Sequence, residues 1–141
     1  MPAYLFDTSA LSEVLRPRPN GEYIAWLSRL PREEQFTSAV VVGELFSGAM
    51  RARAAARWLR RLEEEILPRV TALPFDLDCA REYGRVRAEL LDAGTPIGDA
   101  DAMIAATALR HKFEMVTANV RHFRMVAGLP LRAVGVSGLG R

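Results

Sequence analysis

Cysteine is almost absent from this 141-residue chain, and long apolar runs are missing. The single cysteine, Cys79, excludes an internal disulfide and a thiolate metal cage. The longest uncharged apolar stretches, such as Phe36–Gly43, fall far short of the roughly 20 residues that a membrane-spanning helix needs, so we expect no membrane segment. The first residues also lack the basic segment and apolar run of a secretory signal, which predicts a cytoplasmic protein.

The residues that are present have the composition of a compact protein. Half of them are hydrophobic and 26% are charged, which predicts one domain over residues 1–141 with Ser137–Arg141 as a tail that can fray. The net charge is only +2, yet all 19 basic residues except Lys112 are arginine. Arginine suits bidentate phosphate contacts, but an arginine-biased genome gives the same count. Composition alone therefore supports a nucleic-acid partner only weakly.

Short apolar strands alternate with helical segments along the chain. Helical spacing and capping residues predict helices over residues 10–15, 22–30, 39–50, 51–67, 76–92 and 99–110. Strands are predicted at Tyr4–Phe6, Gln35–Ser38, Val70–Leu73 and Glu114–Thr117, with a further strand near Leu131–Val134. Strands separated by helices need crossover connections, which make neighbouring strands parallel. The pattern predicts an α/β fold, a three-layer α/β/α sandwich with a central parallel sheet of four to five strands.

Polar residues directly after the strands are the first candidates for a site, because ligands bind beyond the carboxyl ends of parallel strands. Asp7 follows the first strand, where it can also simply cap the next helix. Thr117 and Asn119 follow the fourth strand, and an ordinary turn is the alternative explanation for Asn119.

Three further acids lie on predicted helices. Glu44 lies in the apolar stripe of helix 39–50, so we expect its carboxylate to face the core and to need a cation, an arginine or a proton. Asp101 shares the inward face of its helix with Ile104 and Ala105. Asp99 lies about 160° away around that helix and suits an N-cap. Asp101 is therefore the stronger site candidate.

A cluster of Asp7, Glu44 and Asp101 predicts a metal. Three carboxylates within a few ångströms repel one another unless a divalent cation compensates them. Oxygen ligands favour magnesium or manganese over zinc, and a substrate phosphate commonly completes the shell of magnesium. His111 and His122 lack a partner at metal-ligand spacing, so we expect them to be surface or packing residues.

Four segments carry a family resemblance when taken together in their order and spacing: Leu5–Ser9, Gly43–Leu45, Gly98–Ala106 and Val116–Phe123. The chain resembles the PIN-domain ribonucleases and, more narrowly, the VapC-type toxins of prokaryotic toxin–antitoxin pairs, from Tyr4 to about Val134. The resemblance implies an endoribonuclease that hydrolyses RNA and acts as a type II toxin. It further implies a homodimer and a cognate antitoxin whose C-terminal segment covers the acidic site.

The resemblance also implies roles for individual residues. Asp7, Glu44 and Asp101 match the family's catalytic acids, which would bind Mg²⁺, with Mn²⁺ able to substitute. The family often has a fourth acid where this chain has Asn119, which leaves a second metal position in doubt. The accessory residues expected around the acids are Thr8, Ser9, Asp99, Thr117 and Asn119.

Other interpretations of the sequence stay open. Arg53, Arg57 and Arg60 form a stripe at helical spacing that could follow an RNA backbone, although a solvated face partly neutralised by Glu63–Glu65 explains them as well. Asn119 motivates a PIN-like module that binds RNA or a partner without cutting it. A receiver-type signalling domain is the third hypothesis, and the position of Lys112 between a helix and a strand argues against it.

Overall fold

A five-stranded parallel sheet forms the centre of the computed structural model, which describes residues 2–95 and 97–135. Its strand order is β3-β2-β1-β4-β5, and every adjacent pair is parallel. The strands are β1 (Tyr4–Phe6), β2 (Gln35–Ser38), β3 (Thr71–Leu73), β4 (Glu114–Thr117) and β5 (Leu131–Ala133). The predicted parallel sheet is therefore confirmed, including its fifth strand.

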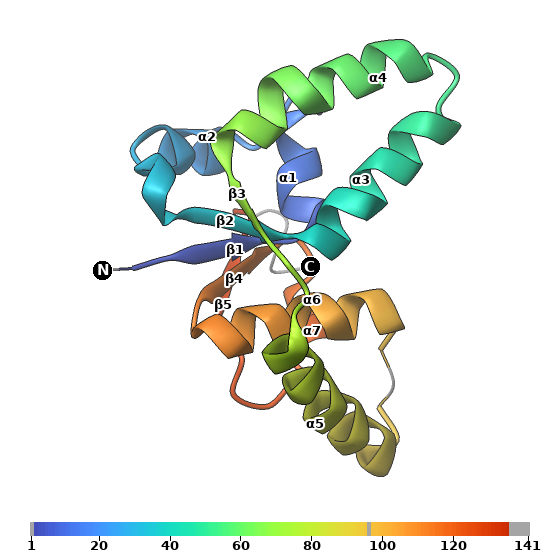
Figure 1. Cartoon of the computed structure of the whole chain (residues 1–141). Helices are drawn as coiled ribbons and strands as arrows, with labels where there is room; N and C mark the ends of the chain where they lie inside the picture. The colour runs from blue at the N-terminus through green and yellow to red at the C-terminus, as the bar shows by residue number, and fades with distance from the viewer. Residues whose placement is uncertain (1, 96, 136–141) are drawn as a thin grey trace.

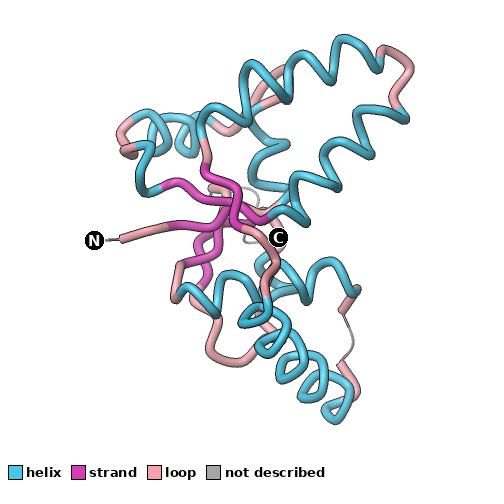
Figure 2. The backbone as a smooth tube through the Cα atoms, viewed as in Figure 1, coloured by secondary structure: helices cyan, strands magenta, loops and turns pink. Residues whose placement is uncertain are grey.

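Helices cover both faces of this sheet (Figures 1 and 2). One layer contains α1 (Thr8–Val14), α2 (Gly21–Ser28), α3 (Ala39–Arg51) and α4 (Ala55–Arg61). The other contains α5 (Leu77–Ala93), α6 (Asp99–His111) and α7 (Val120–Phe123). Short helical segments complete the chain: η1 (Arg32–Glu34), η2 (Leu62–Ile66) and η3 (Leu67–Arg69). The three-layer α/β/α sandwich is confirmed.

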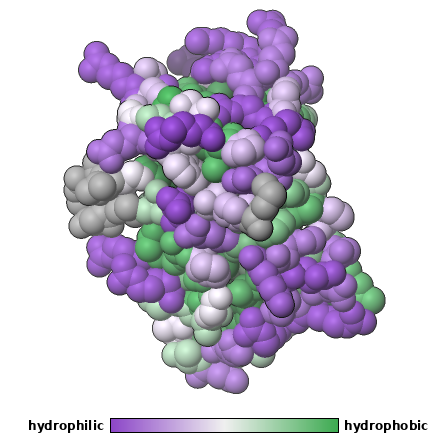
Figure 3. Space-filling view, turned by 90° about the vertical axis from the view of Figure 1, so that its left-hand side faces the viewer, coloured by the Kyte–Doolittle hydropathy of each residue, from purple (hydrophilic) through white to green (hydrophobic). Residues whose placement is uncertain are grey.

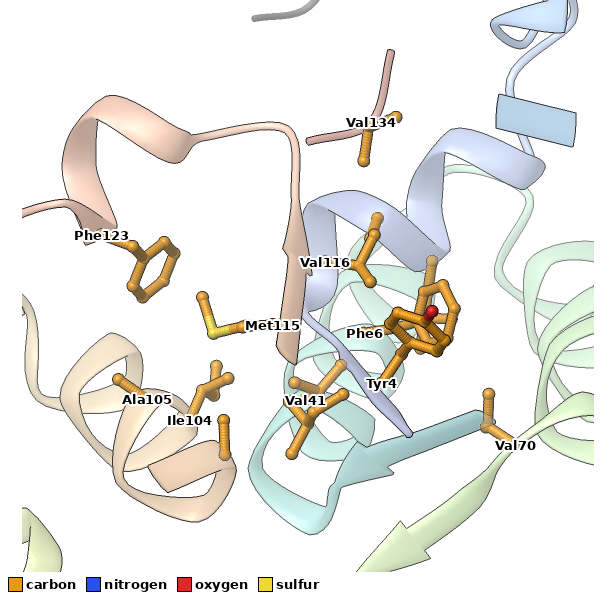
Figure 4. Packing of buried hydrophobic residues seen from close by; sticks show 14 of the residues in the cluster. Tyr4, Phe6, Val41, Val70, Ile104, Ala105, Met115, Val116, Phe123 and Val134 are labelled. Carbon is orange, nitrogen blue, oxygen red and sulfur yellow. The ribbon is translucent and has the colours of Figure 1, made fainter. Parts of the chain in front are cut away.

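The core lies on both sides of the sheet because consecutive strand residues point to opposite faces. In Figure 4, Met115 points toward Ile104 and Phe123, whereas its neighbour Val116 points to the other face. Both β4 residues are fully buried. An apolar strand that is buried on both faces is typical of a parallel sheet covered by two helical layers.

Two predictions from the sequence concern the C-terminal tail and the absence of a membrane segment. The predicted tail Ser137–Arg141 lies outside the described residues. Over residues 2–95 and 97–135, no helix is both long enough and apolar enough to cross a membrane.

The prediction of one continuous helix over residues 51–67 is wrong. Helix α3 continues through Arg51, the backbone is extended at Ala52, and α4 starts only at Ala55. The turn contains neither Gly nor Pro, so local signals do not mark it. Packing explains it: the reversal lets Trp58 and Leu62 pack against the apolar side of α3, and this outweighs the helical propensity of the alanine-rich segment.

Candidate active site

Strands β1 and β4 are neighbours at the point where the strand order reverses. From β1 the chain moves outward to β2 and β3, whereas β4 and β5 lie on the other side. Such a switch point opens a crevice beyond the carboxyl ends of the strands. Asp7 directly follows β1 and Thr117 ends β4, and the Thr117 hydroxyl donates a 2.6 Å hydrogen bond to Oδ2 of Asp7.

Asp7 is a buried carboxylate with three donors around it. It is 5% exposed, and its Oδ1 accepts hydrogen bonds from the Ser9 hydroxyl at 2.7 Å and from the Ala10 N–H at 2.8 Å. Asp7 therefore caps α1 at the carboxyl end of β1. Burial raises the pKa of Asp7 above its ordinary value and the charge of Asp101 adds to this, while the three hydrogen bonds act in the opposite direction.

Ser9 and Thr117 connect Asp7 to the chain segment that follows β4. The Ser9 oxygen accepts from the Ala118 N–H at 2.9 Å, and the Thr117 oxygen accepts from the Asn119 N–H at 2.9 Å. Each hydroxyl thus donates a hydrogen bond to the Asp7 carboxylate and accepts one from a backbone N–H, so it acts both as donor and as acceptor. The structure brings together Asp7, Ser9, Thr117 and the backbone of Asn119, all four of which the sequence predicted as site residues.

Glu44 is held by Thr8, the residue after Asp7. The Thr8 hydroxyl donates a 2.5 Å hydrogen bond to Oε1 of Glu44. Glu44 is half-buried rather than directed into the core, because its position on α3 faces an open pocket. That part of the prediction is wrong. Among the described residues Glu44 has no arginine partner, which excludes the ion-pair explanation for this acid in that part of the chain.

A pocket of about 440 Å³ opens beside Glu44, between α1, α3 and α4. Thr8 and Glu44 supply polar groups, and Arg16 lies on its wall. Most of the remaining lining is apolar: Leu15, Pro17, Leu45, Gly48, Ala49, Ala52, Trp58 and Leu62. An apolar hollow with a few polar groups is typical of a binding site.

The two acids in the first turn of α6 have different surroundings. Asp99 has a side chain 63% exposed, and Tyr83 and Arg87 on α5 contact it at 3.2 and 3.3 Å. Gly98, not Asp99, is the N-cap of α6, so that prediction is wrong. Asp101 lies close enough to Asp7 for its charge to affect the pKa of Asp7. The structure therefore separates Asp99 from Asp101, as their helical positions predicted.

His122 contacts Asp101, and the sequence did not reveal this contact. Its side chain is partly exposed and its ring packs against Phe123, which agrees with the expected surface or packing role, but its Nε2 also lies 2.9 Å from Oδ2 of Asp101. His122 lies on α7, one helical turn after Asn119, and α7 begins directly beyond β4. Proximity to the carboxyl end of a strand, the signal that identified Thr117 and Asn119, could have identified His122 too.

The acids supply hard oxygen donors, which suit magnesium or manganese. Among the described residues, no group of three His, Cys, Asp or Glu side chains is gathered as a ready-made metal site. Asp7 and Asp101 are close enough to interact, and Glu44 reaches the same end of α1 through Thr8. Magnesium is commonly held by one or two carboxylates together with waters and substrate phosphates, so the donor set fits this ion.

The three arginines predicted to form a stripe on one helix are divided between helix α4 and the turn before it. Arg57 and Arg60 lie on α4, but Arg53 lies in the turn before it, so the predicted three-residue helical stripe is wrong. All three are exposed, and the Arg57 guanidinium lies 5.7 Å from the Trp58 ring centre. Figure 3 shows hydrophilic residues over the top of the molecule, the end at which Figure 1 places α4.

Comparison with known proteins shows the family of the chain. The PIN domain model matches residues 4–129. A VapC ribonuclease of Sinorhizobium fredii is 36% identical over 132 residues, which cover 90% of this chain and 94% of the relative. A tRNA(fMet)-specific endonuclease VapC of Salmonella typhimurium is 31% identical, over 89% of this chain and 93% of the relative.

A solved structure extends the likeness to three dimensions. The DNA-bound VapBC complex from Salmonella typhimurium contains a chain that superposes with a TM-score of 0.87 at 30% identity, over 96% of this chain and all of that one. The parallel sheet and its acidic edge thus define a PIN fold, and the receiver-type alternative is excluded. The chain belongs to the PIN domain family, in its VapC-type branch.

Proposed function

We propose that this protein is a Mg²⁺-dependent endoribonuclease that acts as the toxin of a type II toxin–antitoxin pair. The observation that carries the proposal is the buried carboxylate of Asp7, held by the hydroxyls of Ser9 and Thr117 at the switch point of the sheet. The names of the VapC relatives as ribonucleases and endonucleases support the reaction class. RNA is the substrate class, and the cytoplasm is where such a substrate is met.

The residues have separate tasks in this mechanism. Asp7, Glu44 and Asp101 bind the ion, while Ser9 and Thr117 fix the orientation of Asp7, and Thr8 fixes that of Glu44. When bound, Mg²⁺ supplies an activated water and offsets the negative charge that develops on the phosphate. Asn119 adds no charge, so the proposal requires one ion only. Exposed Arg53, Arg57 and Arg60 would hold the RNA backbone beyond the site.

RNA cleavage by the purified protein tests this proposal. With Mg²⁺ or Mn²⁺ and without any antitoxin, the protein should cut RNA, and Asp7→Asn or Asp101→Asn should lower the rate by about 100-fold or more, because each removes an ion ligand worth several kcal/mol of transition-state stabilisation. Asp99→Asn is the matched control and should retain activity. Full activity of Asp101→Asn would reject the site.

A non-catalytic RNA- or partner-binding module is the second candidate. It is favoured by Asn119 in place of a fourth acid and by the lack of a gathered trio of metal ligands among the described residues. The same experiment distinguishes the two functions. Tight RNA binding without turnover at any divalent metal supports the binding module.

The pocket beside Glu44 is the proposed docking place of the antitoxin. Its apolar lining, with Arg16 on the wall, suits the apolar face of a helical segment that carries an acidic residue. A segment in this pocket would lie directly against Glu44 and block RNA, which agrees with a silencing partner. Trp58→Ala should weaken antitoxin binding about tenfold or more in calorimetry, because aromatic residues in such pockets dominate binding energy. Unchanged affinity would place the antitoxin elsewhere.

We further propose that the protein is a homodimer.

A further inference from the structure

Asp101 has one side-chain neighbour that fixes its carboxylate. Its side chain is 37% exposed, and within the described residues its only hydrogen bond is the one between Oδ2 and Nε2 of His122. Tyr83 and Arg87, the nearby donors on α5, contact Asp99 instead. Oδ1 of Asp101 therefore has no protein donor in this part of the chain.

The position of His122 is determined by the core. Its ring packs edge-on against Phe123, with ring centres 5.1 Å apart and an interplanar angle of 83°. Phe123 is 1% exposed and belongs to the core cluster that α6 and β4 also build. The imidazole is thus held between a buried aromatic ring and Asp101, which gives it a defined orientation at the crevice.

The chemistry of the pair fixes the direction of its hydrogen bond. An ionised carboxylate can only accept, so Nε2 carries the hydrogen and donates it to Oδ2. Carboxylates that bind metal ions are commonly oriented by such outer hydrogen bonds, and loss of the partner typically lowers metal affinity about 10- to 100-fold. A half-exposed aspartate on the first turn of a helix otherwise samples several rotamers.

We infer that His122 is a positioning residue for Asp101. It holds Oδ2 so that Oδ1 stays available to a divalent cation, and it thereby couples the segment after β4 to the acid on α6. This inference rests on the proposed function, because it assigns Asp101 as a metal ligand. His122 is thereby added to Asp7, Glu44 and Asp101, the three acids of the proposed metal site.

Calorimetric titration of the purified protein with Mn²⁺ tests the inference. His122→Phe keeps the ring volume but removes the donor, and we expect its Mn²⁺ affinity to fall about 10- to 100-fold. His122→Gln keeps an N–H donor at similar reach and should stay within about threefold of the original protein. Arg121→Gln, an exposed neighbour on α7, is the matched control and should be unchanged.

The outcomes distinguish the positioning role of His122 from the proposed nuclease function. Equal Mn²⁺ affinity of His122→Phe and the original protein overturns the positioning role while leaving the proposed nuclease intact. A His122→Gln variant as weak as His122→Phe also overturns it, because the donor would then not be what matters. Failure of the original protein both to bind Mn²⁺ and to cut RNA overturns the proposed function and this inference together. Unfolding midpoints of all variants exclude a loss caused by misfolding.

Discussion

The crevice beside Asp7, at the carboxyl edge of the sheet, and the turn between α3 and α4, at the far end of one helical layer, have opposite characters. In the crevice the polar groups have partners inside the chain: Asp7 accepts three hydrogen bonds, and Ser9 and Thr117 each link it to the backbone. At the turn, Arg53, Arg57 and Arg60 are exposed, with no ion pair among the described residues. The crevice is therefore organised by folding, whereas the turn is free to meet an external partner.

The largest effect on stability should come from Thr117, at the centre of the crevice. Thr117→Val removes a donor from a buried carboxylate and an acceptor from the Asn119 N–H, so we expect a loss of about 2–3 kcal/mol in the free energy of unfolding, measured by urea denaturation. Thr117→Ser should recover most of the loss.

A matched substitution sharpens this prediction. Thr107 is as deeply buried as Thr117, but its hydroxyl donates to a neutral acceptor, the Met103 carbonyl within α6, and not to a carboxylate. Thr107→Val should therefore cost about 1 kcal/mol or less. Equal losses of unfolding free energy at the two positions would show that the hydrogen bond from Thr117 to Asp7 adds no extra stability.

The smallest effect on stability should come from the turn. Replacing Arg53, Arg57 and Arg60 together by glutamine should change the free energy of unfolding by about 0.5 kcal/mol or less, because exposed side chains without ion pairs contribute little. RNA affinity should fall, and the slope of log affinity against log salt should decrease by about 0.7 for each phosphate that an arginine no longer neutralises. Unchanged RNA affinity and salt slope would favour the solvated-face explanation.

Local sequence signals predicted the sheet and the acids of the crevice for a physical reason. A buried parallel strand must be an apolar run, so Asp7, directly after β1, and Thr117, the last residue of β4, must lie at the carboxyl edge. Helical phase was also enough to separate Asp101 from Asp99, because neighbouring side chains on a helix point in fixed directions.

The features that the sequence did not reveal depend on contacts between distant segments. The break at Ala52–Ala54 is set by packing of Trp58 and Leu62 against α3, and no local breaker marks it. The pairing of His122 with Asp101 joins residues 21 positions apart. The half-exposed setting of Glu44 depends on the pocket that α1 and α4 leave open. Periodicity within one element contains none of this information.

Mn²⁺ binding to the two α6 aspartates tests the central claim most directly. Asp99 and Asp101 lie in the same helical turn but point in different directions, so Asp99→Asn and Asp101→Asn remove the same charge from two different surroundings. Electron paramagnetic resonance of Mn²⁺ titrated into each purified variant should show an intact site in Asp99→Asn and, from the loss of one ligand, a site weaker by about tenfold or more in Asp101→Asn. Equal Mn²⁺ affinity in the two variants would contradict a metal site built on the acids at the carboxyl edge of the sheet.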